Sequence, residues 1–407
     1  MKLLLIAFAC EPNRGSEPGV GWNWATHISK HLNVTVLTRS NNREIIEKEL
    51  RIGKYGNIHF IYYDITLLSK IKKIIPFGTQ LYFLIWELLC LNKINTIQFD
   101  LVQRITFVSA VSFIRGKKIN KPYIYGFVGG GEKTPESVLL HYPNKYKLLE
   151  KLRAYYNSLY KYSSYVKQSI NSSKCSIVVS EESRTLLKSL GYKQKIHLLP
   201  AIGIEKEIVI NDDKIKTGEF VISYAGSLIY LKNVDIILSA ISKIEIGNHK
   251  VEIYGDGKEK KRLIKLAKEL DIFDKTFFNG AVERSKLLNR IKISNLFIFA
   301  SSHDSGGFAV LEAIALNIPV LFLDTGGPSE IFRDIDYKLK VSPNMQYNEI
   351  VSSFTEKIEW VYNNYDSFME IYQEIRKKIL GRYLWENKVA ELIKIYEEVL
   401  DENSSNT

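Results

Sequence analysis

Short apolar runs alternate with amphipathic stretches along the whole chain. In the first half the apolar runs cover residues 2–9, 33–38, 57–63, 101–108, 121–128 and 175–180, and the amphipathic stretches cover 19–31, 79–92 and 140–170. The second half repeats the scheme, with apolar runs at 219–226, 249–255, 275–280, 295–301 and 318–323 and amphipathic stretches at 232–243, 257–270, 283–293 and 307–316. The runs predict buried strands and the stretches predict helices. This alternation indicates parallel sheets that are covered by helices on both faces.

A segment with Pro and Gly, residues 199–204, separates the two halves. We therefore predict an α/β protein with two Rossmann-like, doubly wound domains, 1–200 and 205–375, that face a central cleft. Ligands of such sheets bind at the carboxyl ends of the strands. A C-terminal segment, 376–407, should contain a last helix at about 384–401, and its final residues should fray.

The first ten residues form an apolar run that is similar in length to a short signal peptide. We interpret it as a buried strand, because the run is short and leads directly into a Gly-rich loop. The three cysteines, Cys10, Cys90 and Cys175, are far apart. This spacing favours a reducing, cytoplasmic location and argues against a structural zinc site.

The charge is unevenly distributed along the 407 residues. The whole chain carries a formal net charge of +11, whereas residues 1–180 hold 25 Lys and Arg against 11 Asp and Glu, an excess of 14 positive charges. A basic first half indicates an anionic partner, either a membrane surface or a phosphate-bearing acceptor. We set nucleic acid aside, because the chain carries no recognised nucleic-acid module. The alternative is that these lysines are simply solvated.

Membrane association is a separate prediction. Lys70, Lys72 and Lys73 precede the Leu- and Trp-rich helix at 79–92, and another basic cluster lies at 145–153. Basic and apolar surface together are typical of peripheral membrane enzymes, here on the inner face of the cell membrane. The alternative is that the apolar residues of 81–91 belong to the core. No run of about 18 apolar residues lacks a charge, so we expect no membrane-spanning helix.

Three loops after predicted strands carry the candidate chemistry. Gly19 and Gly21 stand where a helix begins after the first strand, although a structural turn explains this pattern equally well. Gly226 and Ser227 end a strand and are followed by Lys232, which could hold a diphosphate or could be a solvated lysine.

The third loop is the most informative of these segments. Asp304 follows a strand, Gly306 and Gly307 open a helix, and Glu312 lies among apolar residues within that helix. The helix start offers N–H groups to an anion. A carboxylate among apolar neighbours needs a partner, and ribose hydroxyls suit it. The alternative is that Glu312 caps a neighbouring loop.

Four segments in order resemble the retaining GT-B glycosyltransferases of family 4, the glycosyl transferases group 1. They are GSEPGVGWNWA at 15–25, YAGSLIYLKNVD at 224–235, the pair YGDGKEKKRLIKLAKEL and FFNGAVER at 254–284, and DSGGFAVLEAIALNIPVLFLDTGGPSEI at 304–331. The resemblance implies transfer of a sugar from a nucleotide-diphosphate sugar to a glycan or lipid-linked acceptor, with retention of configuration. It also implies a role in cell-surface polysaccharide synthesis, with no bound metal and no other cofactor.

The resemblance also implies site residues. Glu312 would bind the ribose, Asp304 would contact the donor sugar, and the C-terminal helix would cross back to the first domain. Arg104, which stands near the position of a family histidine, could supply positive charge. The residues implied to bind the donor are Gly19, Gly21, Gly226, Ser227, Lys232, Asn279, Val282, Gly306, Gly307 and Phe308.

Three positions depart from the family pattern. Asp304 replaces a glutamate, Ser227 replaces an arginine that would contact the diphosphate, and Gln103 lies in the segment where many members carry a histidine. These changes keep a non-catalytic subunit that binds a glycan or nucleotide open as an alternative. A sugar-nucleotide epimerase or phosphorylase of the same fold is the rival enzyme. Secondary cleft candidates are Glu17, Glu132, His303 and the glycines 129–131.

Overall fold

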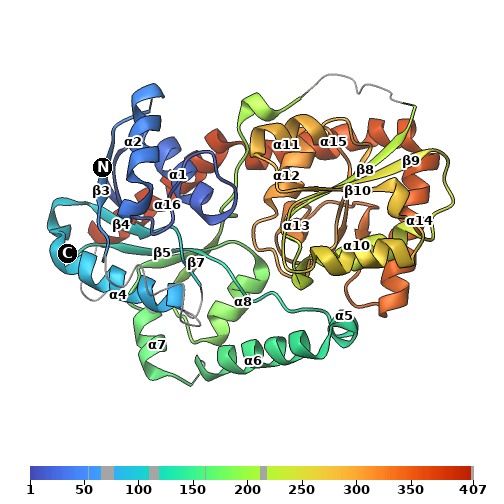
Figure 1. Cartoon of the computed structure of the whole chain (residues 1–407). Helices are drawn as coiled ribbons and strands as arrows, with labels where there is room; N and C mark the ends of the chain where they lie inside the picture. Colours follow the sequence, from blue (N-terminus) through green and yellow to red (C-terminus); the bar gives the residue numbers. More distant parts are fainter. Residues whose placement is uncertain (54, 66–77, 110–118, 161, 211–217, 405–407) are drawn as a thin grey trace. The chain divides into compact units, whose positions relative to one another are not determined.

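The computed structural model describes residues 1–53, 55–65, 78–109, 119–160, 162–210 and 218–404 (Figure 1). Its contacts divide the chain into two compact units. Unit 1 comprises Met1–Gly131, Tyr155–Ala201 and Trp385–Thr407, and unit 2 comprises Glu132–Ala154 and Ile202–Leu384. Each unit contains one sheet, and each is described by itself below.

The sheet of unit 1 is parallel and has the order β3-β2-β1-β4-β5-β6-β7. Its strands are β1 (Lys2–Ile6), β2 (Asn33–Thr38), β3 (Ile58–Tyr62), β4 (Leu101–Arg104), β5 (Tyr123–Val128), β6 (Cys175–Val178) and β7 (Lys195–Leu198). The central strand β1 pairs with β2 and β4, with Leu3 opposite Val34 and Leu101. Every residue of β4, β5 and β6 is buried, as expected for a parallel sheet covered on both faces.

Helices connect these strands. They are α1 (Ser16–Ile28), α2 (Arg43–Ile52), α4 (Gly78–Lys93), α7 (Ser164–Ile170), α8 (Glu181–Ser189) and the C-terminal α16 (Trp385–Ser404), with 3-10 turns η1 (Ser40–Asn42) and η2 (Thr96–Gln98). In α4, Phe83 and Trp86 are buried and pack on Phe8 after β1. These two side chains therefore belong to the core of unit 1, as the alternative interpretation of 81–91 expects.

Unit 2 contains a second parallel sheet, with the order β10-β9-β8-β11-β12-β13. Its strands are β8 (Phe220–Ala225), β9 (His249–Tyr254), β10 (Thr276–Gly280), β11 (Leu296–Phe299), β12 (Val320–Leu323) and β13 (Lys340–Val341). Its helices are α9 (Val234–Ile241), α10 (Lys260–Glu269), α11 (Arg284–Ile291), α12 (Phe308–Ala315), α13 (Gly326–Ile331), α14 (Tyr347–Asn363) and α15 (Tyr365–Tyr383), with turns η4 (Lys206–Ile208), η5 (Tyr230–Lys232) and η6 (Phe273–Lys275). The prediction of two Rossmann-like, doubly wound α/β sheets is confirmed.

Residues 132–154 belong to the first half of the sequence but pack in unit 2. They form α5 (Glu136–His141) and the first turns of α6 (Asn144–Tyr160). His141 stacks on Tyr347 of α14, and the Tyr142 hydroxyl donates to Asn233. The prediction of one helix over 140–170 is wrong, because Pro143 interrupts the chain between α5 and α6 and Ser163 caps the start of α7.

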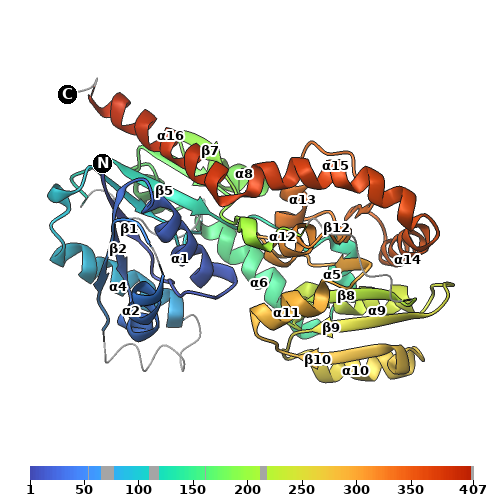
Figure 2. The same ribbon diagram turned by 90° about the horizontal axis from the view of Figure 1, so that it is seen from above.

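The C-terminal helix α16 belongs to unit 1 and lies against α1 (Figure 2). Trp385 packs edge-on to Trp24 and stacks on His27, with ring centroids 5.0 Å apart in both pairs. Near its middle, Tyr396 donates a hydrogen bond to Gln103 of β4. The helix continues to Ser404, so residues 401–404 are helical rather than frayed.

Candidate functional site

In unit 2, the loop after β11 gathers hydrogen-bond donors around one carboxylate. Oδ1 of Asp304 accepts the backbone N–H of Gly307 at 2.7 Å and that of Gly306 at 3.2 Å. Oδ2 of the same carboxylate lies 2.6 Å from Nζ of Lys232, which also donates to the carbonyl of His303. A cation and the N-terminus of α12 thus converge on a negatively charged group.

The start of α12 requires glycine. Gly307 has a φ of 70° at the N-cap of α12, and a Cβ there would come within 2.9 Å of Ile331. The turn at 326–327 packs backbone to backbone on this loop, because the N–H of Gly327 donates to the carbonyl of Asp304 at 2.6 Å. The two Gly-Gly segments therefore form one close-packed edge of the sheet.

Glu312 lies further along α12 and is 7% exposed. Its Oε1 accepts a hydrogen bond from Nε of Arg284, at the start of α11, over 2.6 Å. Burial raises the pKa of Glu312, and the positive charge of Arg284 offsets only part of that effect. Arg284 is a site residue that the sequence analysis missed, although it ends the quoted segment FFNGAVER.

The loop after β8 lies beside the Asp304 loop. The carbonyl of Ser227 accepts from the Tyr224 hydroxyl, and Lys232 ends η5. The Asn233 side chain donates to the carbonyl of Ala300 and to the hydroxyl of Ser302. These bonds fix η5 against the strand end that precedes Asp304.

The remaining predicted donor residues of unit 2 occupy the same edge of its sheet or the neighbouring loop. Gly226 directly follows β8, and Phe308 is the first residue of α12. Asn279, in β10, donates to Glu252, and Val282 lies two residues before Arg284 and packs on the core of unit 2. Contact of Asn279 and Val282 with a base stays a prediction.

The segment 132–154 contributes polar groups to this region that sequence reasoning did not identify, above all Glu150. This carboxylate is buried and contacts His303, the residue before Asp304. Oε1 of Glu132, one of the secondary candidates, is buried and has no hydrogen-bond partner in the described part of the chain. Its Cγ lies next to Gly326.

Unit 1 holds the other predicted residues. Arg104, at the end of β4, is fully buried, and its Nη1 lies 3.0 and 3.1 Å from the two carboxylate oxygens of Glu87 in α4. From the sequence, Arg104 is a candidate to supply positive charge to a departing phosphate. Its position does not support that role, because the guanidinium faces the interior of unit 1. Its sequence position at a strand end gave no sign of the partner in α4.

The glycines of α1 have a packing explanation. A Cβ on Gly19 would lie 2.0 Å from the carbonyl oxygen of Arg14, and one on Gly21 would lie 2.1 Å from that of Ala9. Their approach to phosphates stays a prediction. Nearby, Glu17 accepts the N–H of Phe107 at 2.5 Å, and burial raises the pKa of Glu17.

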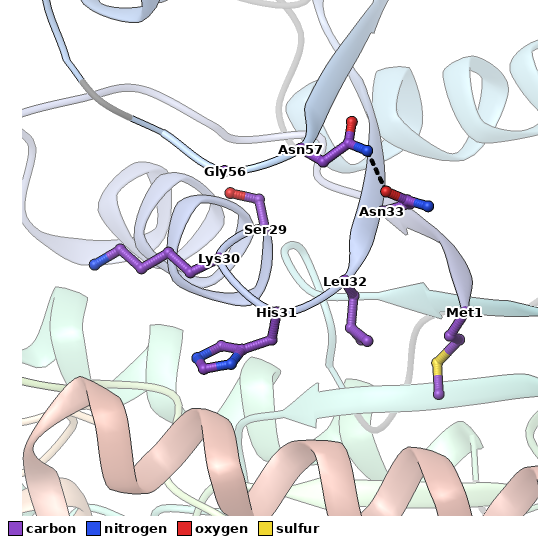
Figure 3. A pocket seen from close by; sticks show the side chains of 8 residues that line it. All are labelled: Met1, Ser29, Lys30, His31, Leu32, Asn33, Gly56 and Asn57. Atoms are coloured by element: carbon purple, nitrogen blue, oxygen red, sulfur yellow. Dashed lines mark hydrogen bonds between the residues drawn. The ribbon is translucent and has the colours of Figure 1, made fainter.

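A shallow hollow of about 280 Å³ in unit 1 lies elsewhere (Figure 3). It is lined by residues at the end of α1 and before the strands, among them Met1, His31, Asn33 and Asn57, and the last two are hydrogen-bonded. These residues mark the amino ends of β1, β2 and β3. Nucleotides bind at the opposite, carboxyl edge of such sheets, so this hollow is not the predicted site.

None of the helices in the described ranges is both long and apolar enough to cross a bilayer. Lys70, Lys72 and Lys73, which prompted the membrane prediction, lie outside the described residues. Within those ranges, no three His, Cys, Asp or Glu side chains gather as metal ligands would.

Residues 205–378 match the model of a protein family described as Glycosyl transferases group 1. An uncharacterized glycosyltransferase of Methanocaldococcus jannaschii, MJ1607, is 25% identical over 214 residues, which are 52% of this chain and 51% of that protein. Other curated relatives are named as glycosyltransferases of lipopolysaccharide core and O-antigen biosynthesis. The chain spans about half the length of the first curated relatives that it matches.

Solved structures resemble the whole chain. Sucrose-phosphate synthase of Thermosynechococcus elongatus aligns with a TM-score of 0.68 and 14% identity, covering 98% of this chain and 99% of that one. Anabaena Alr3699/HepE, solved with UDP and glucose, aligns with a TM-score of 0.64 and 12% identity, covering 98% and 100%. The fold is that of the GT-B glycosyltransferases, and the matched part of unit 2 has the sequence features of group 1.

Proposed function

We propose that this chain is a retaining family 4 glycosyltransferase that moves a sugar from a nucleotide-diphosphate sugar to a glycan or lipid-linked acceptor. One observation carries the proposal: Lys232 and the N–H groups of Gly306 and Gly307 already converge on an anion, the carboxylate of Asp304. A helix N-terminus with a neighbouring lysine is a binding arrangement suited to phosphate.

In the proposed donor complex, a phosphate takes the position of the Asp304 carboxylate on these donors. The freed carboxylate can then turn toward hydroxyls of the donor sugar. Glu312 accepts hydrogen bonds from the ribose, and the bond from Arg284 orients its buried carboxylate.

In the transfer step, the bond between the anomeric carbon and the diphosphate oxygen breaks. The acceptor oxygen bonds to the same face of that carbon, and its proton passes to the departing phosphate. Lys232 and the N–H groups at the start of α12 stabilise the charge that develops on the leaving group. The proposal assigns this stabilisation to protein groups and needs no bound metal.

The acceptor belongs to cell-surface polysaccharide synthesis in this proposal. This assignment is supported by the names of two relatives, which are glycosyltransferases of lipopolysaccharide core biosynthesis and of O-antigen biosynthesis. The basic first 180 residues suit a phosphate-bearing acceptor or an anionic membrane surface. A cytoplasmic enzyme, docked peripherally on the inner face of the cell membrane, would meet such acceptors.

The test is a thermal-shift screen of the purified chain with UDP-, GDP-, ADP- and dTDP-sugars. A donor present at about 100 times its Kd stabilises the fold by roughly 2.7 kcal/mol, so one base should raise the Tm clearly. The stabilising donor should then release nucleoside diphosphate when acceptor is added. Binding without any release across acceptors and hydrolysis conditions would favour the non-catalytic subunit, and no shift with any donor would refute the donor site.

A further inference from the structure

Glu150 of α6 has a buried carboxylate that contacts four side chains. It lies in segment 132–154, which belongs to the first half of the sequence but packs in unit 2. It is 8% exposed. Oε1 accepts from the Tyr230 hydroxyl at 3.0 Å and from Nη1 of Arg153 at 2.9 Å. Oε2 accepts from the Thr134 hydroxyl at 3.1 Å and lies 3.3 Å from Nε2 of His303.

The positions of two of these partners matter for the donor site. Tyr230 lies in η5, two residues before Lys232, and His303 directly precedes Asp304. One carboxylate therefore contacts both loops that supply the anion site. The two loops also meet through the Lys232–Asp304 ion pair, which a bound phosphate would replace in the proposed function. Glu150 would continue to connect them in the donor complex.

We propose that Glu150 is a positioning residue of the donor site, holding η5 and the loop 301–307 so that Lys232 and the amides of Gly306 and Gly307 meet one anion. This inference rests on the proposed function for its role in catalysis. All of these contacts lie within unit 2. Through them, segment 132–154 would help to position the proposed donor site.

The electrostatics of Glu150 agree with this role. Burial acts to raise its pKa, but the contact with His303 and the charge of Arg153 outweigh burial and lower the pKa to about 2. The carboxylate therefore stays charged at neutral pH, and its hydrogen bonds are charge-assisted.

Glu259 offers a matched control in the same unit. It is also buried, at 4% exposure, and like Glu150 it binds the arginine three residues later, Arg262, and a tyrosine hydroxyl, that of Tyr146. The two tyrosines, Tyr146 and Tyr230, stack on each other with centroids 4.0 Å apart. Among the described residues, the Glu259 carboxylate bonds to Tyr146 and Arg262 and makes no hydrogen bond or ion pair with His303 or the loop 301–307.

The experiment compares Glu150→Gln with Glu259→Gln in the full chain. Both variants should lose thermal stability to a similar degree. Only Glu150→Gln should weaken binding of the nucleoside diphosphates UDP, GDP, ADP and dTDP, with the preferred one bound about tenfold to a hundredfold less tightly, as expected for losing hydrogen bonds to a charged group. The KM for the donor should rise more than kcat falls.

A second readout needs no ligand. The backbone amide resonances of Gly306 and Gly307 should shift in Glu150→Gln and stay in place in Glu259→Gln. Should Glu150→Gln fail to fold, Tyr230→Phe removes one bond to Oε1, keeps the stacked ring, and should shift the same amides.

The outcomes separate the two proposals. Unmoved glycine amides in these variants, or equal losses of affinity in Glu150→Gln and Glu259→Gln, would overturn the positioning role. If the wild-type chain binds none of the four nucleotides, the proposed function fails, whereas the amide shifts still decide whether Glu150 orders the two loops.

Discussion

Two charge pairs near strand ends, one in each unit, differ in whether a ligand could reach them. In unit 1, the side chains of Arg104 and Glu87 are 0% and 4% exposed. In unit 2, those of Lys232 and Asp304 are 14% and 25% exposed. The first pair is an internal bond that supports the packing of α4 on the sheet. The second combines a cation with helix amides at a partly exposed position, and we propose that a ligand anion replaces its carboxylate there.

The difference follows from where each cation lies relative to its strand. Arg104 is the last residue of β4, within the hydrogen-bonded sheet, and its side chain extends into the helix layer. Lys232 lies beyond β8, in a 3-10 turn outside the sheet. Of these two cations, the one that lies beyond its strand, Lys232, is therefore the candidate for anion binding.

The largest expected effect is a loss of stability when the buried Arg104–Glu87 pair of unit 1 is broken. Arg104→Met should destabilise the protein by about 3–5 kcal/mol, because it leaves the carboxylate of Glu87 buried without its cation. Urea unfolding would measure this as a lower midpoint. Removing both charges in Arg104→Met with Glu87→Leu should recover much of the loss. A single variant within about 1 kcal/mol of wild type would contradict the comparison.

Breaking the partly exposed Lys232–Asp304 pair of unit 2 should instead affect activity more than stability. Lys232→Met should cost less than about 1 kcal/mol of stability, since partly exposed ion pairs contribute little. It should lower kcat/KM for the donor by roughly 10²–10³, the usual effect of losing one stabilising group at a developing charge. Steady-state kinetics next to the unfolding curves would reveal the split. Near-normal transfer with a large loss of stability would place Lys232 with Arg104 as a structural cation.

A finer test changes only the charge of Asp304. Asp304→Asn keeps an oxygen for the amides of Gly306 and Gly307 but releases Lys232 from its ion pair. Nucleoside diphosphate should then bind up to about fivefold more tightly, because a partly exposed ion pair worth about 1 kcal/mol no longer competes. Sugar transfer should still fall, since the carboxylate is proposed to contact the donor sugar. Isothermal titration with the preferred nucleotide measures the affinity, and weaker binding would show that Asp304 does not compete with phosphate.

The smallest effect concerns the pH dependence of stability. Burial raises the folded-state pKa of Glu312 above 4.5, so the folded protein binds more protons than the unfolded chain between 4.5 and that raised value. The contribution of Glu312 is therefore most favourable below pH 4.5 and declines as pH rises through this window. Glu312→Gln should remove that decline, which Tm values across the window would register. If the Tm of both proteins depended on pH in the same way, the pKa of Glu312 would not be raised by burial as proposed.

The sequence predicted the architecture well, because buried parallel strands appear as continuous apolar runs. Residues 33–38 were predicted as a strand and form β2, and the predicted helix at 307–316 corresponds to α12. The helices α14 and α15 were not predicted, although Ile350, Phe354 and Ile358 lie at helical spacing on the buried face of α14. Local patterns also brought Asp304, Gly306, Gly307 and Glu312 to attention, since they lie close together in sequence.

What could not be predicted depends on contacts between distant segments. Glu87 follows a stretch of apolar residues, and nothing in its neighbourhood indicates a bond to Arg104. Glu150 lies on a helix that looks like a continuation of the first domain, yet its partners include His303. The sequence around Arg284 gives no sign of its bond to Glu312, which forms only because α11 and α12 lie side by side in the fold. Charged residues at such positions acquire a meaning only from the tertiary fold.

We propose that a nucleoside diphosphate binds to the loops after β8 and β11 and to the start of α12. The most direct measurement is an experimental structure of the full chain with the nucleotide that the thermal screen selects. We expect a phosphate oxygen within hydrogen-bond distance of Lys232 Nζ and of the amides of Gly306 and Gly307, with the ribose hydroxyls on Glu312. A nucleotide bound elsewhere, with the Asp304 carboxylate still on those amides, would contradict the claim.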